Sequence, residues 1–383
     1  MSRMEFYTYR IGEVFNRFSS GKSLNEKYIT PNGKYPVYGG NGLRGYTETS
    51  NFNGECILVG RQGAKCGNVR YFLGEGYMTD HAIVGVANKK FDIKYLSYAL
   101  SSLNLNRLSG QAAQPGLSVT ILKKQKILLP SYENQQNISK IIDYYDLLIE
   151  NNNKRIKILE QMAEELYKEW FVRFRYPGYE HDSFVGDIPI RWKISRIKEL
   201  GKIITGKTPS TKNESYYGEY CMFVKTPDMH GNTFVISTSE NLSQEGSDSQ
   251  KNCLIEPDSI MVSCIGTGGI VAINKKLAHT NQQINSIVLK NIDYLYWTYF
   301  AVKSLKETIE MYGNTGTTMT NLSKGKFEKI KIVNPNDELK RLFQSKVQPL
   351  MDELYNLIES NENLVKQRDL LLPSLMSGKL EVK

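Results

Sequence analysis

The chain has 383 residues, of which 40% are hydrophobic and 23% are charged. This composition is typical of a folded protein with two or three domains and excludes a largely disordered chain. The formal net charge of +9 favours a polyanionic partner, because lysines and arginines close to phosphates release condensed counterions. The alternative is a basic surface that has no such partner.

The sequence gives no sign of a membrane or secreted protein. It has no run of about 18 apolar residues that could cross a bilayer, and its N-terminal residues do not resemble a signal peptide. The five cysteines are odd in number and lack CxxC spacing, which argues against disulfides and against a zinc site. We therefore expect a cytoplasmic protein with reduced, mostly buried thiols and no membrane partner.

In chain order, the same series of features occurs twice. Ile11–Phe15 is followed by Ser-Gly-Lys-Ser at residues 20–23, and Ile197–Gly201 is followed by Thr-Gly-Lys-Thr at residues 205–208, so the spacing within the two motifs differs by only one residue. Short apolar segments between Gly, Asn and Pro turns then predict strands, with a helix near Leu96–Leu108 in the first half. These features predict a tandem duplication of an α/β (α+β) domain with pseudo-two-fold symmetry.

Each half ends with a polar glycine-rich loop, a short apolar strand and a long helical pattern. The helical patterns begin at Glu133 and Glu338. The stretch from Ile197 to Glu338 is longer than the one from Ile11 to Glu133, so the second globular half is the larger. The sequence therefore predicts four segments. They are globular domains over residues 1–130 and 179–336, and long helices within residues 131–178 and 337–383.

Apolar residues recur at spacings of three and four along both long helices. From Ile138 and Val347 onward, the two patterns keep a constant offset, which pairs Asn152 with Asn361. Such a stripe over about four heptads predicts an antiparallel coiled coil, and a polar Asn within its seam would fix the register. The residues expected in the seam include Tyr145, Leu148, Asn152, Leu354, Leu357 and Asn361. The alternative is that both asparagines face water.

Prolines and helix length bear on this prediction. A helix from Glu133 to about Arg173 would be roughly 60 Å long at ~1.5 Å per residue, long enough to hold two domains apart. Pro177 follows the first helix, and Pro373 is expected to interrupt the end of the second. Pro349 is expected to kink the second helix or to mark its start.

The motifs of several enzyme classes are missing from the sequence. It contains no segment like the Asn-Pro-Pro-Tyr of amino-methyltransferases, and its four histidines lack metal-site spacing. We interpret Gly266–Gly269 as a tight turn after a strand, and Thr79–His81 as a locally hydrogen-bonded segment rather than part of an acid–base pair. We therefore predict no catalytic residue and no metal site.

Several segments resemble one known protein family. Leu159–Glu180, which contains Glu-Glu-Leu-Tyr-Lys-Glu-Trp-Phe, is similar to the central region of the specificity subunits of type I restriction–modification enzymes. Leu370–Leu380 is similar to their C-terminal region, and Ile188–Lys193 resembles the entry into their second recognition domain. Gly110–Ser118, followed by Ile127–Pro130, resembles the exit from the first. The resemblance covers the whole chain, including the duplication.

The resemblance implies a function in which the missing motifs are expected. Two target recognition domains would each read one half of a split site in double-stranded DNA, and the two long helices would set the spacer. The helices would also recruit two adenine-N6 methyltransferase subunits, which bind S-adenosylmethionine. The complex could add two restriction subunits, which use ATP and Mg²⁺. The chain itself would be a non-catalytic specificity subunit with no cofactor of its own.

The residues leave two other functions open. One is a self-sufficient DNA-modifying or DNA-cleaving enzyme whose catalytic motif is not recognised. The other is a coiled-coil scaffold that binds protein and no DNA, for which binding to duplex DNA would be absent or insensitive to salt.

Within each recognition domain, we expect basic side chains to contact phosphates, and amide, hydroxyl or guanidinium groups to contact base edges. The candidates in the first domain are Arg44, Tyr46, Arg61, Gln62, Lys65, Gln111 and Gln114. The candidates in the second are Lys207, Lys225, Thr226, Asp228, Asn314 and Thr315. The alternative for each is a solvent-exposed loop residue. Trp170, near the end of the first long helix, is expected to pack in a core.

Overall fold

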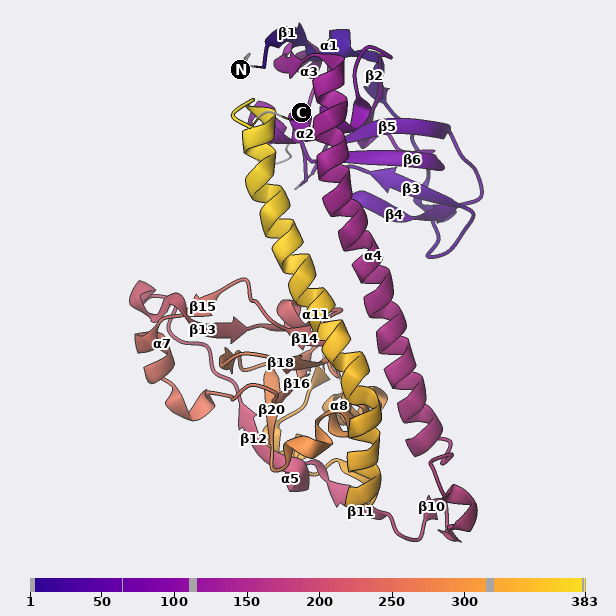
Figure 1. Cartoon of the computed structure of the whole chain (residues 1–383), viewed down its shortest axis with the longest axis vertical. Coiled ribbons are helices and arrows are strands. Elements are labelled where there is room, and N and C mark those ends of the chain that lie inside the picture. Colours follow the sequence, from indigo (N-terminus) through magenta and orange to yellow (C-terminus); the bar gives the residue numbers. More distant parts are fainter. Residues whose placement is uncertain (1–3, 64, 110–115, 315–319, 381, 383) are drawn as a thin grey trace. The chain divides into compact units, whose positions relative to one another are not determined.

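The computed structural model describes residues 4–63, 65–109, 116–314, 320–380 and 382 (Figure 1). The chain forms two compact units. The first unit comprises Met1–Glu150 and Glu362–Lys383, and the second comprises Asn151–Asn361. Among the described residues, no helix has both the length and the apolarity that a membrane span requires.

A six-stranded sheet of order β2-β7-β5-β6-β3-β4 forms the centre of the first unit (Figure 1). Alternate residues of β5 enter different cores: Ile57 packs with residues of the helices, whereas Cys56 and Leu58 pack with Phe72 on the other face. Both faces are therefore covered, which explains the unbroken apolar run in this strand. The globular part consists of β1 (Phe6–Arg10), α1 (Ile11–Val14), β2 (Phe15–Ser20), β3 (Tyr35–Gly39), β4 (Gly42–Thr47), β5 (Phe52–Gly60), β6 (Val69–Met78), β7 (Ala82–Ala87), α2 (Ile93–Ser102), α3 (Val119–Lys124) and β8 (Lys126–Pro130).

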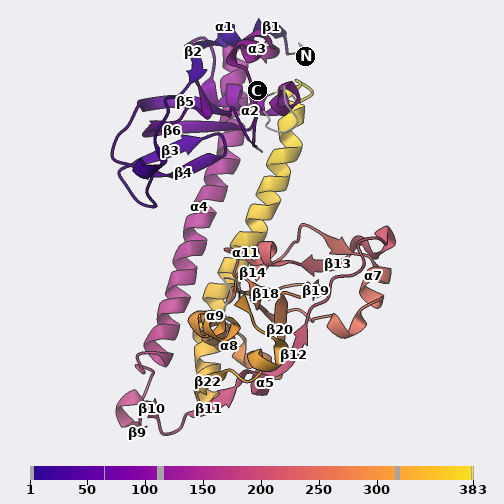
Figure 2. The same ribbon diagram turned by 180° about the vertical axis from the view of Figure 1, so that it is seen from behind.

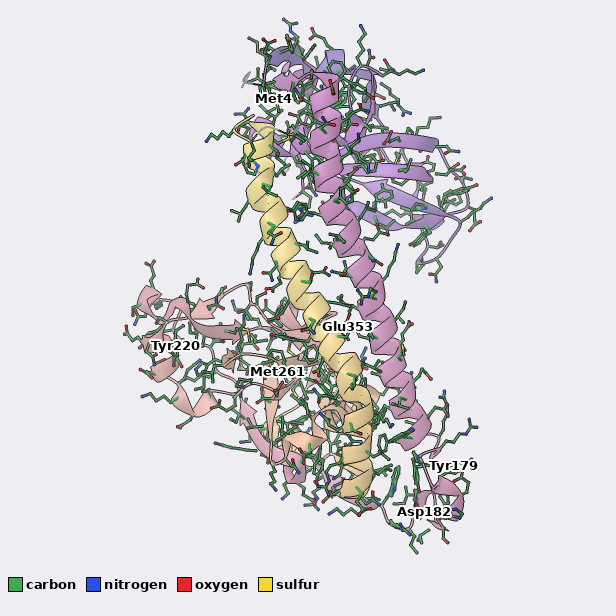
Figure 3. The ribbon with its side chains drawn as sticks, in the orientation of Figure 1. Met4, Tyr179, Asp182, Tyr220, Met261 and Glu353 are labelled. Atoms are coloured by element: carbon green, nitrogen blue, oxygen red, sulfur yellow. The ribbon has the colours of Figure 1, made fainter. Side chains whose placement is uncertain are left out.

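The second unit contains a five-stranded sheet of order β12-β20-β16-β18-β14 and a three-stranded sheet of order β15-β13-β19 (Figure 2). Met261 of β16 is fully buried among these strands (Figure 3). The strands are β9 (Phe184–Val185), β10 (Ile188–Pro189), β11 (Lys193–Arg196), β12 (Gly201–Thr205), β13 (Tyr217–Val224), β14 (Phe234–Val235), β15 (Asn241–Leu242), β16 (Ile260–Ser263), β17 (Ile265–Gly266), β18 (Val271–Asn274), β19 (Ala278–Thr280), β20 (Ile284–Leu289), β21 (Thr320–Asn321) and β22 (Lys331–Asn334). The short helices are α5 (Ile197–Leu200), α6 (Thr226–Met229), α7 (Gln244–Asp248), α8 (Leu295–Lys303), α9 (Lys306–Gly313) and α10 (Lys324–Phe327).

Hydrogen bonds at equivalent positions confirm the duplication. The Ile11 amide donates to the Gln125 carbonyl in the first unit, and the Ile197 amide donates to the Ile330 carbonyl in the second. The donors are the residues at which the repeated motif begins in the sequence, and the acceptors directly precede β8 and β22. The antiparallel pairs β1–β8 and β11–β22 also correspond, as do β2–β7 and β12–β20.

The two long helices, α4 (Tyr132–Phe171) and α11 (Asp337–Met376), contribute residues to both units. In the second unit, the Nδ2 of Asn152 donates to the Oδ1 of Asn361 at 2.9 Å, and Arg155 pairs with Glu353. The partner number falls as the α4 number rises, so the helices run antiparallel there. Asn152 is buried, which confirms its predicted place in the seam and excludes the water-facing alternative.

The other residues predicted to lie in the seam differ in how deeply they are buried. Leu354 and Leu357 are buried, and Tyr145 is partly buried. The prediction that Leu148 lies in a buried seam is wrong, because 48% of Leu148 is exposed. In that part of α4 the buried face instead includes Ile142, which packs into the core of the first unit.

The bounds of α11 test what was expected of Pro349 and Pro373. Because α11 begins at Asp337, Pro349 does not mark the start of the second helix. Pro373 does not interrupt the helix either, since α11 continues to Met376. Pro349 is exposed, so the carbonyl that loses its helical hydrogen bond to a proline can be hydrated.

The asparagine pair predicts a stability effect. Replacing Asn152 with Leu should lower the free energy of unfolding by about 1 kcal/mol or more, because the Asn361 amide loses a partner. The double substitution Asn152→Leu/Asn361→Leu should recover most of that loss, because both polar groups are then removed. Urea denaturation of the full chain measures both effects. The exposed neighbour Asn151, changed to Leu, is the control, and an unchanged midpoint for Asn152→Leu would contradict the prediction.

Candidate nucleic-acid interface

In the first unit, the ends of β2, β3, β5 and β6 lie close to one another and to the segment at Leu117. They are joined by backbone hydrogen bonds of 2.9–3.0 Å. The bonds run from Gly21 N to Ala82 O, Lys22 N to Met78 O, Thr79 N to Tyr38 O, Arg61 N to His81 O, and Leu117 N to Arg61 O. This loop frame brings the backbone segments of residues 22, 61–62 and 79–81 close together.

The second unit contains the same loop frame. Its bonds run from Gly206 N to Ile284 O, Lys207 N to Thr280 O, Asn281 N to Val224 O, Cys264 N to Gln283 O, and Leu322 N to Cys264 O. Each of these five bonds has a counterpart at the equivalent position in the first unit. The turn of residues 281–283 therefore corresponds to the turn of residues 79–81.

The duplicated Gly-Lys pairs are explained by this frame. A Cβ atom at Gly21 would lie 2.2 Å from the Met78 carbonyl oxygen, and one at Gly206 would lie 2.2 Å from the Asn281 carbonyl oxygen. Glycine is therefore required for the close backbone approach. The next residue in each case, Lys22 or Lys207, is exposed beside the turn.

The candidates of the first domain fall into three groups. Arg61 and Gln62 belong to the loop frame, and Gln62 forms a β-bridge with Gly116. Arg44 on β4 lies close to the frame, since a Cβ at Gly39 would lie 2.8 Å from its Cδ, but its guanidinium pairs with Glu26. The remaining candidates are Tyr46, partly buried on β4; Lys65, exposed; and Gln111 and Gln114, which lie outside the described residues.

The candidates of the second domain include residues with structural partners and residues that are exposed. Thr226 is buried and donates from Oγ1 to the Oε1 of Gln283 at 3.2 Å. Lys225 pairs with Glu240, and Asp228 accepts from the Lys225 backbone amide at the start of α6, so both have structural partners. Lys207 and Asn314 are exposed, and Thr315 lies outside the described residues.

The sequence analysis missed the turn of residues 281–283. Gln282 is exposed, and Asn281 and Gln283 are partly buried. In the first domain, the equivalent Asp80 and His81 were expected to form only local hydrogen bonds. The backbone bond from Ala82 N to Thr79 O confirms the local hydrogen bonding expected for Thr79–His81. One sequence pattern could have identified these turns. In both halves a threonine, Thr79 or Thr280, is followed by polar residues and then by an apolar strand.

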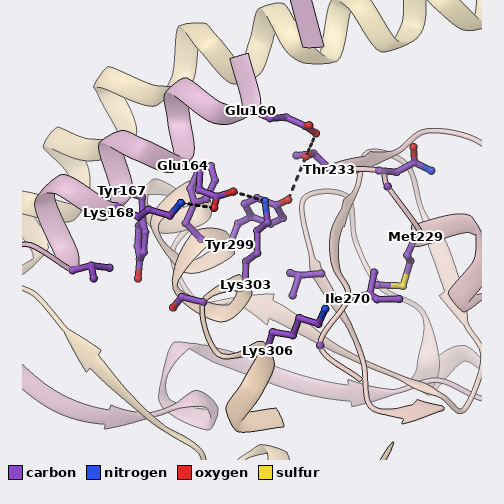
Figure 4. Close-up of a pocket in the computed structure, with 17 residues that line it drawn as sticks. Glu160, Glu164, Tyr167, Lys168, Met229, Thr233, Ile270, Tyr299, Lys303 and Lys306 are labelled. Carbon is purple, nitrogen blue, oxygen red and sulfur yellow. Dashed lines mark hydrogen bonds and ion pairs between the residues drawn. The ribbon is translucent and has the colours of Figure 1, made fainter. Parts of the chain in front are cut away.

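A cavity of about 510 Å³ lies elsewhere in the second unit, between α4, α8 and the segment before β14 (Figure 4). The carboxylate of Glu164 accepts hydrogen bonds from Lys303 at 2.8 Å and from Lys168 at 2.9 Å, and Thr233 donates to Glu160. Burial raises the pKa of Glu164, but the hydrogen bonds and charges of the two lysines hold it below its ordinary value. The cavity is lined by two glutamates and three lysines, and two of these lysines pair with Glu164.

Trp170 is buried, as predicted, and packs against Phe343 of α11 with ring centroids 5.8 Å apart. The cysteines are free thiols, and four of the five are buried. The described part of the chain contains no cluster of three or more His, Cys, Asp or Glu side chains suited to a metal ion.

His279 is buried on β19, and one residue, Thr280, separates it from the turn of residues 281–283. One ring nitrogen, Nε2, is 2.9 Å from the Ser247 hydroxyl, and Nδ1 has no hydrogen-bond partner within the described residues. Burial lowers the pKa of the imidazole from 6.5 to about 4, because the charged ring would lose its hydration.

This burial predicts a pH effect on stability. As the pH falls from about 6.5 to about 4, the unfolded chain binds a proton at His279 while the folded protein does not, so the free energy of unfolding falls. His279→Gln should flatten that dependence, as measured by denaturation at a series of pH values. His230→Gln, at an exposed position, is the matched control and should keep the slope. Equal slopes for wild type and His279→Gln would refute the assignment.

The family model and the curated relatives that match this chain all belong to type I restriction–modification systems. A family model described as the type I restriction modification DNA specificity domain matches residues 4–161 and 189–367. The HindI specificity subunit of Haemophilus influenzae is 32% identical over 328 residues, covering 70% of this chain and 71% of that protein. The EcoprrI specificity subunit of Escherichia coli is 38% identical over 144 residues, covering 38% of this chain and 35% of that protein.

A solved structure shows the same fold. The crystal structure of the type I restriction–modification S subunit from M. genitalium superimposes with a TM-score of 0.65 and 18% sequence identity. The match covers 98% of this chain and 97% of the other chain. At this level of identity, the likeness concerns the fold, including the two globular domains and the two long helices.

Proposed function

The chain belongs to the family of type I restriction–modification DNA specificity proteins, and we propose that it selects the DNA sequence at which partner subunits act. In this proposal each globular domain reads one half of a bipartite site in double-stranded DNA. The chain carries out no chemistry itself.

The observation that carries the proposal is the duplicated loop frame with different side chains. The backbone bonds are the same in both domains, whereas the turn is Thr-Asp-His in one and Asn-Gln-Gln in the other. A fixed backbone with variable polar groups suits the recognition of base edges, since the groups must be held in place and must differ between sequences. Two unlike half-sites are therefore expected rather than a palindrome.

Charge supports DNA as the partner. The net charge is +9, and Lys22 and Lys207 are exposed at equivalent positions beside the two turns. Lysines placed in this way can neutralise phosphates on either side of the bases that are read. A scaffold that binds only protein would not require a lysine at this position in both domains.

Partner subunits would supply the catalysis. We propose two methyltransferase subunits, which bind S-adenosylmethionine and methylate adenine N6, and two restriction subunits, which use ATP and Mg²⁺. Exposed apolar side chains on the long helices support protein docking there; among the described residues they include Leu147, Ile158, Met162 and Leu370. The paired helices would also set the spacer between the half-sites.

The test is reconstitution with the methyltransferase subunit. The purified chain alone should neither methylate nor cleave DNA. With the methyltransferase subunit and S-adenosylmethionine, it should direct methylation to adenines in one split sequence, which sequencing of the modified bases in genomic DNA can identify. The methyltransferase subunit without this chain is the control.

Three results would count against the proposal. Methylation or Mg²⁺-dependent cleavage by the chain alone would indicate an enzyme with an unrecognised motif. DNA binding by the complex that is absent or does not weaken with salt would indicate a protein scaffold. Methylation that follows a single uninterrupted sequence would exclude two separate readers.

The proposed spacer role predicts the effect of lengthening the helices. Four residues inserted in α4 between Glu150 and Asn151, together with four in α11 between Glu362 and Asn363, should add about 6 Å to the paired rod. The spacer should then lengthen by about two base pairs at ~3.4 Å each, with both half-sites unchanged. Mapping of methylated adenines measures the spacer.

A matched control inserts the same four residues in the exposed loop near Pro31, away from the helices. This variant should keep the original spacer. If the helix insertions left the spacer unchanged in an active complex, the paired helices would not set it.

A further inference from the structure

The turns of residues 79–81 and 281–283, named here reading turn 1 and reading turn 2, are held on both sides in each domain. In reading turn 2, the Asn281 amide donates to the Val224 carbonyl, and the Gln283 carbonyl accepts from the Cys264 amide. The next residue, Ile284, starts β20, which pairs with both β12 and β16. Each turn is therefore fixed by main-chain bonds to three neighbouring segments.

The side chains of reading turn 2 are also oriented. The Oε1 of Gln283 accepts from the Oγ1 of Thr226 at 3.2 Å and from the Nδ2 of Asn281 at 3.1 Å. Its Nε2 lies 3.7 Å from the position that a Cβ would take at Gly266, which has a φ of +83°. Since two donors occupy the carbonyl oxygen, Gln283 can offer only N–H donors to a ligand.

Gln282 has different hydrogen-bonding capacity. It is exposed, and its Oε1 accepts a single hydrogen bond, from the Oγ1 of Thr208 at 2.6 Å. The amide thus keeps an acceptor lone pair on Oε1 as well as the Nε2 donors. Together these groups match the N6 donor and N7 acceptor that adenine presents in the major groove.

We infer that reading turn 2 reads base edges in the major groove, with Gln282 recognising adenine and Gln283 donating to an acceptor such as N7 or O6 of a purine. Reading turn 1 has the same role in the first domain. There, Asp80 would accept from the N4 amino group of cytosine, and the exposed His81 would be a second contact.

This inference deepens the proposed function and rests on it. The nearest lysines support DNA as the ligand, because Lys22 and Lys207 are exposed and their amides donate to Met78 and Thr280, directly before each turn. The replacement of Asp80-His81 by Gln282-Gln283 on one backbone frame gives a physical reason for two different half-sites.

The experiment uses the complex reconstituted with its methyltransferase, and its readout is the methylated sequence. Gln282→Ala should relax one position in one half-site, with a loss of discrimination of tenfold to a hundredfold, on the order expected for a bidentate base contact. Asp80→Ala should relax a position in the other half-site only. The spacer should not change in either variant.

Gln244→Ala, which also truncates an exposed glutamine of the second unit, is the matched control and should leave the sequence unchanged. Equal thermal unfolding midpoints for wild type and Gln282→Ala would exclude a folding defect, which is not expected at an exposed side chain. Gln283→Ala gives a second test at the same turn.

The outcomes separate the inference from the proposed function. If wild type methylates one split sequence but neither Gln282→Ala nor Gln283→Ala alters it, the inference is wrong and the proposed function stands. A uniform decrease across all sequences would indicate phosphate contacts and would also overturn base reading. If wild type directs no split-site methylation, the proposed function fails, and this inference fails with it.

Discussion

The close approach of the backbone at Gly21 and Gly206 is the constraint on which both loop frames depend. At each position a Cβ would lie 2.2 Å from a carbonyl oxygen, that of Met78 directly before one turn or that of Asn281 within the other. Because glycine removes that collision, the segment after β2 or β12 can bond to both sides of the turn. The lysine that follows and the polar turn residues are then held at fixed positions in both domains.

The frame assigns the positioning of the loops to the main chain and leaves the side chains of the turns to contact bases. Main-chain hydrogen bonds position the loops, and these bonds do not depend on which side chains are present. The turn residues can therefore differ between the domains without altering the local fold.

The additional residues of the second domain lie outside the frame. In the frame, Tyr38 corresponds to Val224 and Arg61 to Cys264, and the chain between them is longer in the second domain. Most of the additional residues therefore lie in the segment that forms α6, β14, β15 and α7.

Sequence patterns predicted the long helices well where one interaction dominated. A constant offset between the two helical patterns identified the Asn152–Asn361 pair, which the second unit confirms with a 2.9 Å hydrogen bond. The pattern was less informative where the helix surface has more than one neighbour. Near Leu148, the α4 side chains divide between the core of the first unit and solvent, so a repeat at spacings of three and four cannot specify which of them is buried.

The sequence by itself determined the duplication, the fold class and the family, because local pattern and repeated motifs encode these properties. Only the tertiary structure decided which polar residues share one surface. It assigned Lys225 and Asp228 to structural partners and placed Gln282 and Gln283 beside Lys207. The physical reason is that these neighbours come from segments far apart in the chain, and their contacts depend on strand pairing that no local pattern records.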